Sequence, residues 1–232
     1  MLTAPHFSPD KLESVRTRIK RAAETAGRDP ATVRLLAVTK EQPVTRVRDA
    51  AAAGQVEFGE NYVQEAVAKI EQLADLRLTW HFIGQLQSNK TREVARHFDW
   101  VHTVDRLRIA ERLSAQRSVH ASPLQVLLQV SLVDEPGKGG AAPAELPALA
   151  QAVAALPRLQ LRGLMCIPPP VTGLDAQRAL FRPLRELRDR LNDAGHQLDT
   201  LSMGMSDDLE AAVIEGATLV RVGTALFGPR HT

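Results

Sequence analysis

Several residue types that define common functional classes are scarce in this sequence. There is one cysteine, Cys166, among 232 residues, so no disulfide can form within the chain. Aromatic residues make up 4% of the sequence, which leaves few rings on which nucleic-acid bases could stack. The formal net charge is only +2, too small to attract a phosphate backbone strongly. The low aromatic content and the small net charge argue against nucleic acid as a partner.

Long apolar runs are also missing, and no stretch approaches the length that crosses a bilayer. The N-terminus is polar and lacks the pattern of a signal peptide. The histidines are scattered and show no metal-ligand spacing. With 44% hydrophobic and 24% charged residues, the composition is that of a globular protein. We therefore expect a cytoplasmic protein with no membrane partner and no metal site.

Short apolar runs alternate with amphipathic segments along the chain. After an opening helix over 10–27, the pattern predicts eight strands, over 33–39, 56–59, 78–83, 100–104, 124–132, 159–167, 198–203 and 219–222. The helices between them are predicted over 43–54, 62–73, 90–98, 106–117, 144–156, 175–194 and 207–215, with a short tail over 224–227. Such alternation predicts an α/β protein with a parallel sheet.

Eight repeats favour a closed (β/α)₈ TIM barrel, which forms at about this chain length. The alternative is a doubly wound open sheet, but no dinucleotide-binding fingerprint follows the first strand. No linker-like stretch divides the chain. We therefore predict one domain over 1–232, with an extra N-terminal helix over 10–27 and the barrel over 33–228.

Lys40 ends the first apolar run, Leu35-Leu36-Ala37-Val38-Thr39-Lys40. In a barrel, the carboxyl ends of the strands carry the functional site. Partial burial there favours the neutral amine, the form that attacks an aldehyde to make a Schiff base. By itself, a lysine after a strand is usually only a solvated strand end. The combination with an anion site is what makes Lys40 a candidate.

Two glycine-bearing segments follow the seventh and eighth predicted strands, where barrels commonly hold phosphate. Gly204 and Gly223 would let backbone N–H groups approach an anion, and the hydroxyls of Ser202, Ser206 and Thr224 could add donors. Ser206 also precedes two aspartates, so it could be an ordinary helix cap. An amine and a phosphate cradle together suggest pyridoxal 5′-phosphate (PLP).

Arg221 stands between apolar neighbours in the last strand. Buried inside a barrel, its charge needs a partner. One interpretation is an ion pair with a barrel carboxylate such as Glu60. The other is a hydrogen bond to a pyridine nitrogen, to which arginine can donate without giving up a proton. His81 could act as a base, but a histidine within a strand is more often structural.

Five ordered motifs between about 33 and 228 resemble those of the pyridoxal phosphate homeostasis protein family, also called the proline synthetase co-transcribed protein family. They are Val38-Thr39-Lys40, Phe58-Gly59-Glu60-Asn61-Tyr62-Val63-Gln64-Glu65, Trp80-His81-Phe82-Ile83-Gly84-Gln85-Leu86-Gln87-Ser88-Asn89-Lys90, Leu201-Ser202-Met203-Gly204-Met205-Ser206-Asp207-Asp208 and Arg221-Val222-Gly223-Thr224-Ala225-Leu226-Phe227-Gly228.

The resemblance implies the barrel fold of the alanine racemase N-terminal domain and PLP bound as an internal aldimine on Lys40. It also implies phosphate contacts from the last two loops, Arg221 at the pyridine nitrogen and Asn61 beside the ring. The predicted cofactor-binding residues are Lys40, Asn61, Met165, Ser202, Met203, Gly204, Ser206, Arg221, Gly223 and Thr224.

The resemblance implies a protein that carries and buffers PLP, delivers it to PLP-dependent apoenzymes, and affects amino-acid and keto-acid pools. The alternative is a PLP-dependent amino-acid racemase of fold type III. Racemases of that fold use a tyrosine from an additional C-terminal domain as the opposing base, whereas Tyr62 is the only tyrosine here. We therefore expect a PLP carrier with no catalytic residues, rather than an enzyme. The short loops, separately, predict a monomer.

Overall fold

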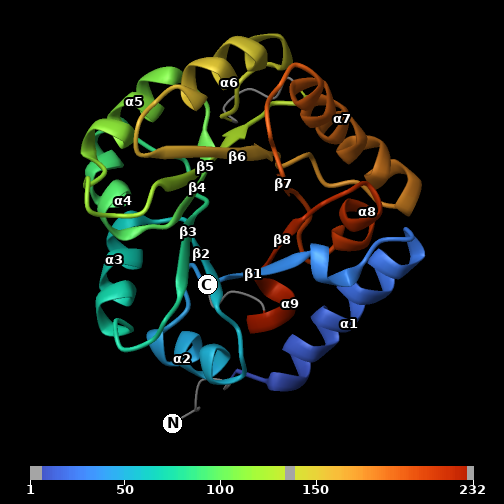
Figure 1. The fold of residues 1–232 in the computed structure, drawn as a ribbon. Coiled ribbons are helices and arrows are strands. Elements are labelled where there is room, and N and C mark those ends of the chain that lie inside the picture. The colour runs from blue at the N-terminus through green and yellow to red at the C-terminus, as the bar shows by residue number, and fades with distance from the viewer. Residues whose placement is uncertain (1–6, 134–138, 229–232) are drawn as a thin grey trace.

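Eight parallel strands close into a barrel in which each strand pairs with the next and the last pairs with the first (Figure 1). The computed structural model describes residues 7–133 and 139–228, so the outermost residues of the predicted domain lie outside it. The strands are β1 (Arg34–Val38), β2 (Glu57–Glu60), β3 (Thr79–Phe82), β4 (Trp100–Val104), β5 (Leu124–Gln129), β6 (Leu159–Met165), β7 (Thr200–Ser202) and β8 (Leu219–Val222). The prediction of a (β/α)₈ barrel is confirmed.

Helices surround the barrel on its outer side (Figure 1). They are α1 (Pro9–Thr25), α2 (Val44–Ala52), α3 (Val63–Gln72), α4 (Thr91–His97), α5 (Leu107–Gln116), α6 (Leu146–Ala154), α7 (Leu174–Asp193), α8 (Leu209–Ile214) and α9 (Thr224–Phe227). Short 3₁₀ turns, η1 (Pro30–Thr32), η2 (Ser88–Lys90) and η3 (Pro143–Glu145), join some elements. The predicted tail over 224–227 is one helical turn, α9. Within the described ranges, no helix has both the length and the apolar character needed to span a membrane.

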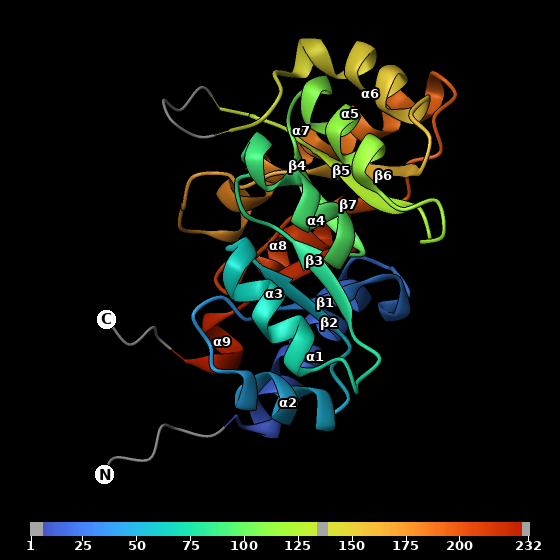
Figure 2. The same ribbon diagram turned by 90° about the vertical axis from the view of Figure 1, so that its left-hand side faces the viewer.

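The extra N-terminal helix α1 packs against α8 and α9, the last two helices of the chain (Figure 1). Its buried residues recur at helical spacing, at Leu12, Val15 and Ile19. Figure 2 shows α9 and the segment between β6 and α7 at the same end of the barrel. That end carries the loops that follow the strands, so the N-terminal helix supports the side of the barrel on which a site is expected.

The apolar core lies mainly between the strands and the helices. Strand side chains alternate in direction, and those facing outward, such as Phe58, Val101 and Leu201, are fully buried in this shell. The inside of the barrel holds two small, separate apolar clusters, Leu36 with Ile83 and Leu219, and Trp100 with Leu127 and Met165. The rest of the interior is polar, and its groups must pair with one another.

The pairing of β6 with β5 contains a register shift, next to a glycine that β7 approaches closely. Val126 pairs with Leu161, but Leu127 pairs with Gly163, which leaves Arg162 as an extra residue. A Cβ atom on Gly163 would lie 1.7 Å from the carbonyl oxygen of Thr200 in β7. Glycine is therefore required there because the neighbouring backbone occupies the space of a side chain.

We predict that Gly163→Ala lowers the free energy of unfolding by about 3 kcal/mol, because two paired strands must move apart. The matched control is Gly27→Ala. A Cβ added to Gly27 would meet no atom within 4 Å, but its φ is +67°, so we expect a loss of about 1 kcal/mol. Urea unfolding of both variants measures the difference. Equal losses would show that close strand packing is not what requires glycine at 163.

Candidate functional site

A cavity of about 230 Å³ opens at the carboxyl ends of the strands. Six of the ten predicted site residues line it: Lys40, Asn61, Ser206, Arg221, Gly223 and Thr224. A second cavity, also about 230 Å³, adjoins it and shares Asn61, Ile83 and Ile167. The structure thus brings an amine, an amide, a guanidinium and two hydroxyls to one chamber.

Lys40 lies two residues beyond the end of β1 and is half-buried at the cavity wall. The next residue, Glu41, has a φ of +62°, which is rare for a residue other than glycine. The chain therefore turns sharply just after Lys40. Such a backbone conformation persists only where neighbouring contacts hold it.

A buried ionic cluster supplies those contacts, and Lys69 of α3 is its centre. The Lys69 Nζ donates to the Thr39 carbonyl oxygen at 2.6 Å, to Glu60 at 2.8 Å and to Glu65 at 2.6 Å. The Thr39 hydroxyl donates to Glu60 at 2.6 Å, and the Glu41 N–H donates to Glu65 at 2.6 Å. The residues on both sides of Lys40 are thus held by one cluster, the Lys69 cluster.

Glu60 gains its charge partner from this cluster rather than from the barrel interior. Its side chain is fully buried, and burial raises the pKa of its carboxyl although Lys69 opposes that rise. The interpretation that Arg221 forms an ion pair with Glu60 is therefore wrong. Because Lys69 is almost wholly buried in this structural role, it also does not offer a free amine to a second ligand.

Arg221 reaches the cavity from β8, and its side chain is held from below. Its Nη1 donates to the Ser202 hydroxyl at 2.7 Å, and its Nη2 donates to the Cys166 carbonyl oxygen at 2.9 Å. Burial lowers the pKa of Arg221, but a guanidinium stays protonated in proteins. Burial raises the pKa of the Cys166 thiol to about 12, so this cysteine remains a protonated core residue.

The other four predicted residues lie behind the cavity wall. Ser202 is fully buried, and its hydroxyl is engaged by Arg221 instead of facing the cavity. Met165 packs inside the barrel with Trp100, and Met203 packs in the outer shell. At Gly204, with a φ of +93°, a Cβ would lie 2.5 Å from the Cβ of Ala212. Gly204 thus allows the close approach of α8.

The loop after β7 is fixed from outside by the N-terminal helix. Arg18 of α1 donates to the Ser206 carbonyl oxygen at 2.8 Å and pairs with Glu210 of α8 at 2.6 Å. The Ser206 hydroxyl accepts a hydrogen bond from the Ala225 N–H at 3.3 Å, which ties this loop to α9. The two loops predicted to hold phosphate are therefore bound to each other.

Sequence reasoning missed the apolar part of the lining and the supports behind it. Ile83, Ile167 and Met205 line the cavity as apolar side chains. Ile83 and Ile167 end predicted strands, so their position was a usable signal. Arg18 gave no such signal, because its contact spans 188 residues of sequence. In the described residues, no group of three or more metal-ligating side chains gathers.

We predict that Lys69→Met lowers the free energy of unfolding by about 3–5 kcal/mol, because Glu60 keeps a buried charge without a partner. The double variant Lys69→Met with Glu60→Gln should recover part of that loss, since no carboxylate is then left uncompensated. Urea unfolding at neutral pH measures these two variants and Glu60→Gln alone. If the double variant were as unstable as the sum of the two single changes, the charge argument would fail.

Comparison with known proteins places the whole barrel in one family. The family model described as alanine racemase, N-terminal domain, matches residues 11–231. The chain is 61% identical over 221 residues to a pyridoxal phosphate homeostasis protein of Pseudomonas aeruginosa, covering 95% of both. It is 52% identical over 222 residues to the protein of that name in Escherichia coli K12, covering 94% of this chain and 95% of that one.

Solved structures give the same result. PipY of Synechococcus elongatus, with PLP bound, superposes with a TM-score of 0.80 at 44% identity, covering 91% of this chain and 100% of that one. Alanine racemase of Corynebacterium glutamicum superposes with a TM-score of 0.67 at 17% identity, a likeness of fold alone, and the match covers 98% of this chain but 63% of the racemase.

Proposed function

The chain belongs to the alanine racemase N-terminal domain family, among its pyridoxal phosphate homeostasis proteins, and on that premise we propose that it carries and buffers PLP on Lys40. The observation that carries this proposal is the convergence of Lys40, Arg221, Ser206 and Thr224 on one cavity. In this function the protein holds the cofactor in the cytoplasm and supplies it to PLP-dependent apoenzymes.

The residues present fit PLP in chemistry. Gly223 and Thr224 lie where α9 begins, and the first N–H groups of a helix have no acceptor within it. With the Ser206 hydroxyl they form a set of donors suited to phosphate. The Asn61 Oδ1 atom is buried at the cavity and has no hydrogen-bond partner within the described ranges, so it is available to a ligand.

When bound, PLP supplies an aldehyde carbon that accepts an amine. Lys40 would hold the cofactor covalently through its side-chain nitrogen, and water would be released. The Lys69 cluster holds the backbone on both sides of Lys40, so the amine is positioned before any ligand arrives. Arg221 would donate toward the ring nitrogen without transferring a proton. It would thereby keep the ring a weak electron acceptor, which disfavours carbanion chemistry.

Carriage fits the described cavity better than racemisation does. Two-base racemisation needs an acid or base on each face of the ring. The only tyrosine, Tyr62, is 53% exposed, precedes α3 and lies outside the lining of this cavity. The buried histidines His81 and His102 also lie outside it, within the barrel. The described lining therefore offers neither a tyrosine nor a histidine as a second base.

We predict that Lys40→Ala abolishes covalent capture of PLP. Wild-type protein incubated with PLP and reduced with borohydride should carry the adduct on the peptide containing Lys40, as measured by mass spectrometry. Lys90→Ala is the control, because Lys90 lies in η2 outside the cavity lining and should not affect labelling. If Lys40→Ala incubated with PLP showed the same visible absorbance before reduction and the same amount of adduct after it as the wild type, Lys40 would not be the residue that captures PLP.

We also predict that the PLP-loaded protein does not interconvert D- and L-amino acids at enzymatic rates. Chiral chromatography after incubation with either enantiomer of alanine measures this. Lys40→Ala incubated with the same concentration of PLP serves as the background, since free PLP alone racemises slowly. Turnover of about 1 per second or faster, as is ordinary for enzymes, would replace the carrier by a racemase.

A further inference from the structure

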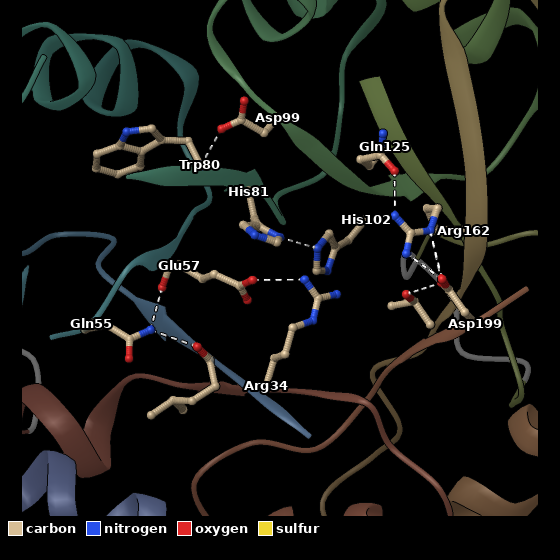
Figure 3. Close-up of polar contacts among 12 residues, drawn as sticks. Arg34, Gln55, Glu57, Trp80, His81, Asp99, His102, Gln125, Arg162 and Asp199 are labelled. Atoms are coloured by element: carbon tan, nitrogen blue, oxygen red, sulfur yellow. Dashed lines mark hydrogen bonds and ion pairs between the residues drawn. The ribbon is translucent and has the colours of Figure 1, made fainter. Parts of the chain in front are cut away.

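Four buried polar side chains form a line through the barrel beneath the cavity. Arg221 Nη1 contacts Ser202 Oγ at 2.7 Å, Ser202 Oγ contacts His102 Nδ1 at 2.9 Å, and His102 Nε2 contacts His81 Nδ1 at 2.9 Å. Figure 3 shows the two imidazole rings meeting inside the barrel. Ser202, His102 and His81 are completely buried, and Arg221 almost so. The carrier function assigned above makes direct use of Arg221 alone.

Both histidines are neutral. Burial lowers the pKa of His81 and of His102 well below the ordinary value, and nearby cations act in the same direction. Arg34 faces both rings, while Arg221 and His81 also face His102. A neutral imidazole has one N–H donor and one acceptor nitrogen. Each ring can therefore donate a hydrogen bond from one nitrogen only and must accept one at the other.

Arg221 determines that direction because a guanidinium donates and never accepts. The Ser202 oxygen accepts from Arg221, so its own hydrogen is available for His102 Nδ1. His102 Nδ1 is then the acceptor, and its Nε2–H donates to His81 Nδ1. The remaining N–H of His81, on Nε2, has no partner in the part of the chain that the structure describes.

The reverse arrangement satisfies fewer groups. If His102 Nδ1 carried the hydrogen, Ser202 would accept twice, and its own hydrogen would have no acceptor among the hydrogen bonds of the described residues. His81 Nε2 would then also lack a partner, as a bare acceptor. Two buried groups would go unpaired instead of one, and each carries a desolvation penalty. The first direction is therefore the stable one.

The far end of the line is held by a rigid cluster near the amino ends of the strands. The His81 ring stacks on Trp100 at 5.3 Å between centroids, with 9° between the ring planes. Arg34 and Arg162 also lie over Trp100, at 4.9 and 5.1 Å. Glu57 pairs with Arg34, and Asp199 pairs with Arg162 (Figure 3). His81 therefore cannot shift without displacing this cluster.

We propose that His102 is a positioning residue for Arg221: by accepting the Ser202 hydroxyl, it fixes the guanidinium that would donate to the cofactor's ring nitrogen. This role rests on the proposed function, because it concerns how Arg221 meets PLP. The line is a brace and not a proton wire, since Arg221 at its upper end neither takes up nor releases a proton. The brace links the cofactor site to the opposite end of the barrel.

The test compares His102→Leu with His102→Asn, two replacements of nearly equal shape. The asparagine Oδ1 can still accept the Ser202 hydroxyl, whereas leucine cannot. We expect His102→Leu to weaken PLP binding about tenfold, and His102→Asn to stay within about twofold of wild type. His120→Asn, at an exposed turn, is the control and should leave binding unchanged.

The pH dependence of the bound cofactor's visible absorbance distinguishes positioning from packing. A fixed cation beside the ring nitrogen opposes its protonation. We therefore expect the absorbance transition of that nitrogen to move to higher pH in His102→Leu and in Ser202→Ala, but not in His102→Asn. Ser202→Ala also decides the matter if His102→Leu does not fold. Identical behaviour of the leucine and asparagine variants in both measurements would overturn the proposal.

Nitrogen-15 NMR of the PLP-free protein tests the brace independently. The direction derived above requires that both His81 and His102 carry their hydrogen on Nε2, with Nδ1 bare. A protonated Nδ1 on either ring would overturn the proposal whether or not PLP binds. If instead wild-type protein showed this tautomer pattern but failed to bind PLP at Lys40, the carrier function would fail while the direction of the brace stood.

Discussion

Pairing between the first and last strands is the constraint on which the site depends. Arg34, Leu36 and Ala37 of β1 lie opposite Leu219, Arg221 and Val222 of β8. Only this closure brings Lys40, just beyond β1, into the same cavity as Gly223 and Thr224, just beyond β8. An open sheet would leave these groups at opposite edges. Barrel closure is thus a chemical requirement here as well as a way to remove unpaired strand edges.

Two different devices hold the two principal side chains of the site. Lys40 is held by charged groups in the Lys69 cluster, which lies between the barrel and α3. Arg221 is held by neutral groups that cross the barrel interior. The two devices hold different parts of their residues. The neutral hydroxyl and imidazole hold the Arg221 side chain without adding a second positive charge inside the barrel, whereas the ionic cluster holds the backbone on both sides of Lys40.

The fold could be predicted from sequence because each repeat carries the same local pattern, and residues after strands share one end of a parallel barrel. That reasoning also grouped Lys40 with Thr224. It failed where side-chain direction mattered. Ser202 was expected at the cavity, but it is the last residue of β7 and points inward beneath Arg221. The contacts of Lys69 and Arg18 with distant parts of the chain could not be predicted either. Periodicity shows which face of a helix is buried but not which distant atoms that face contacts.

Barrel closure also sets an order of events during translation. Lys40 emerges from the ribosome long before Gly223, with most of the chain between them. At about 5–20 residues per second, the delay is roughly ten to forty seconds. Throughout that interval Lys40 exists without the loops after β7 and β8 that complete its cavity. The cavity can therefore form only late in synthesis, when β8 pairs with β1.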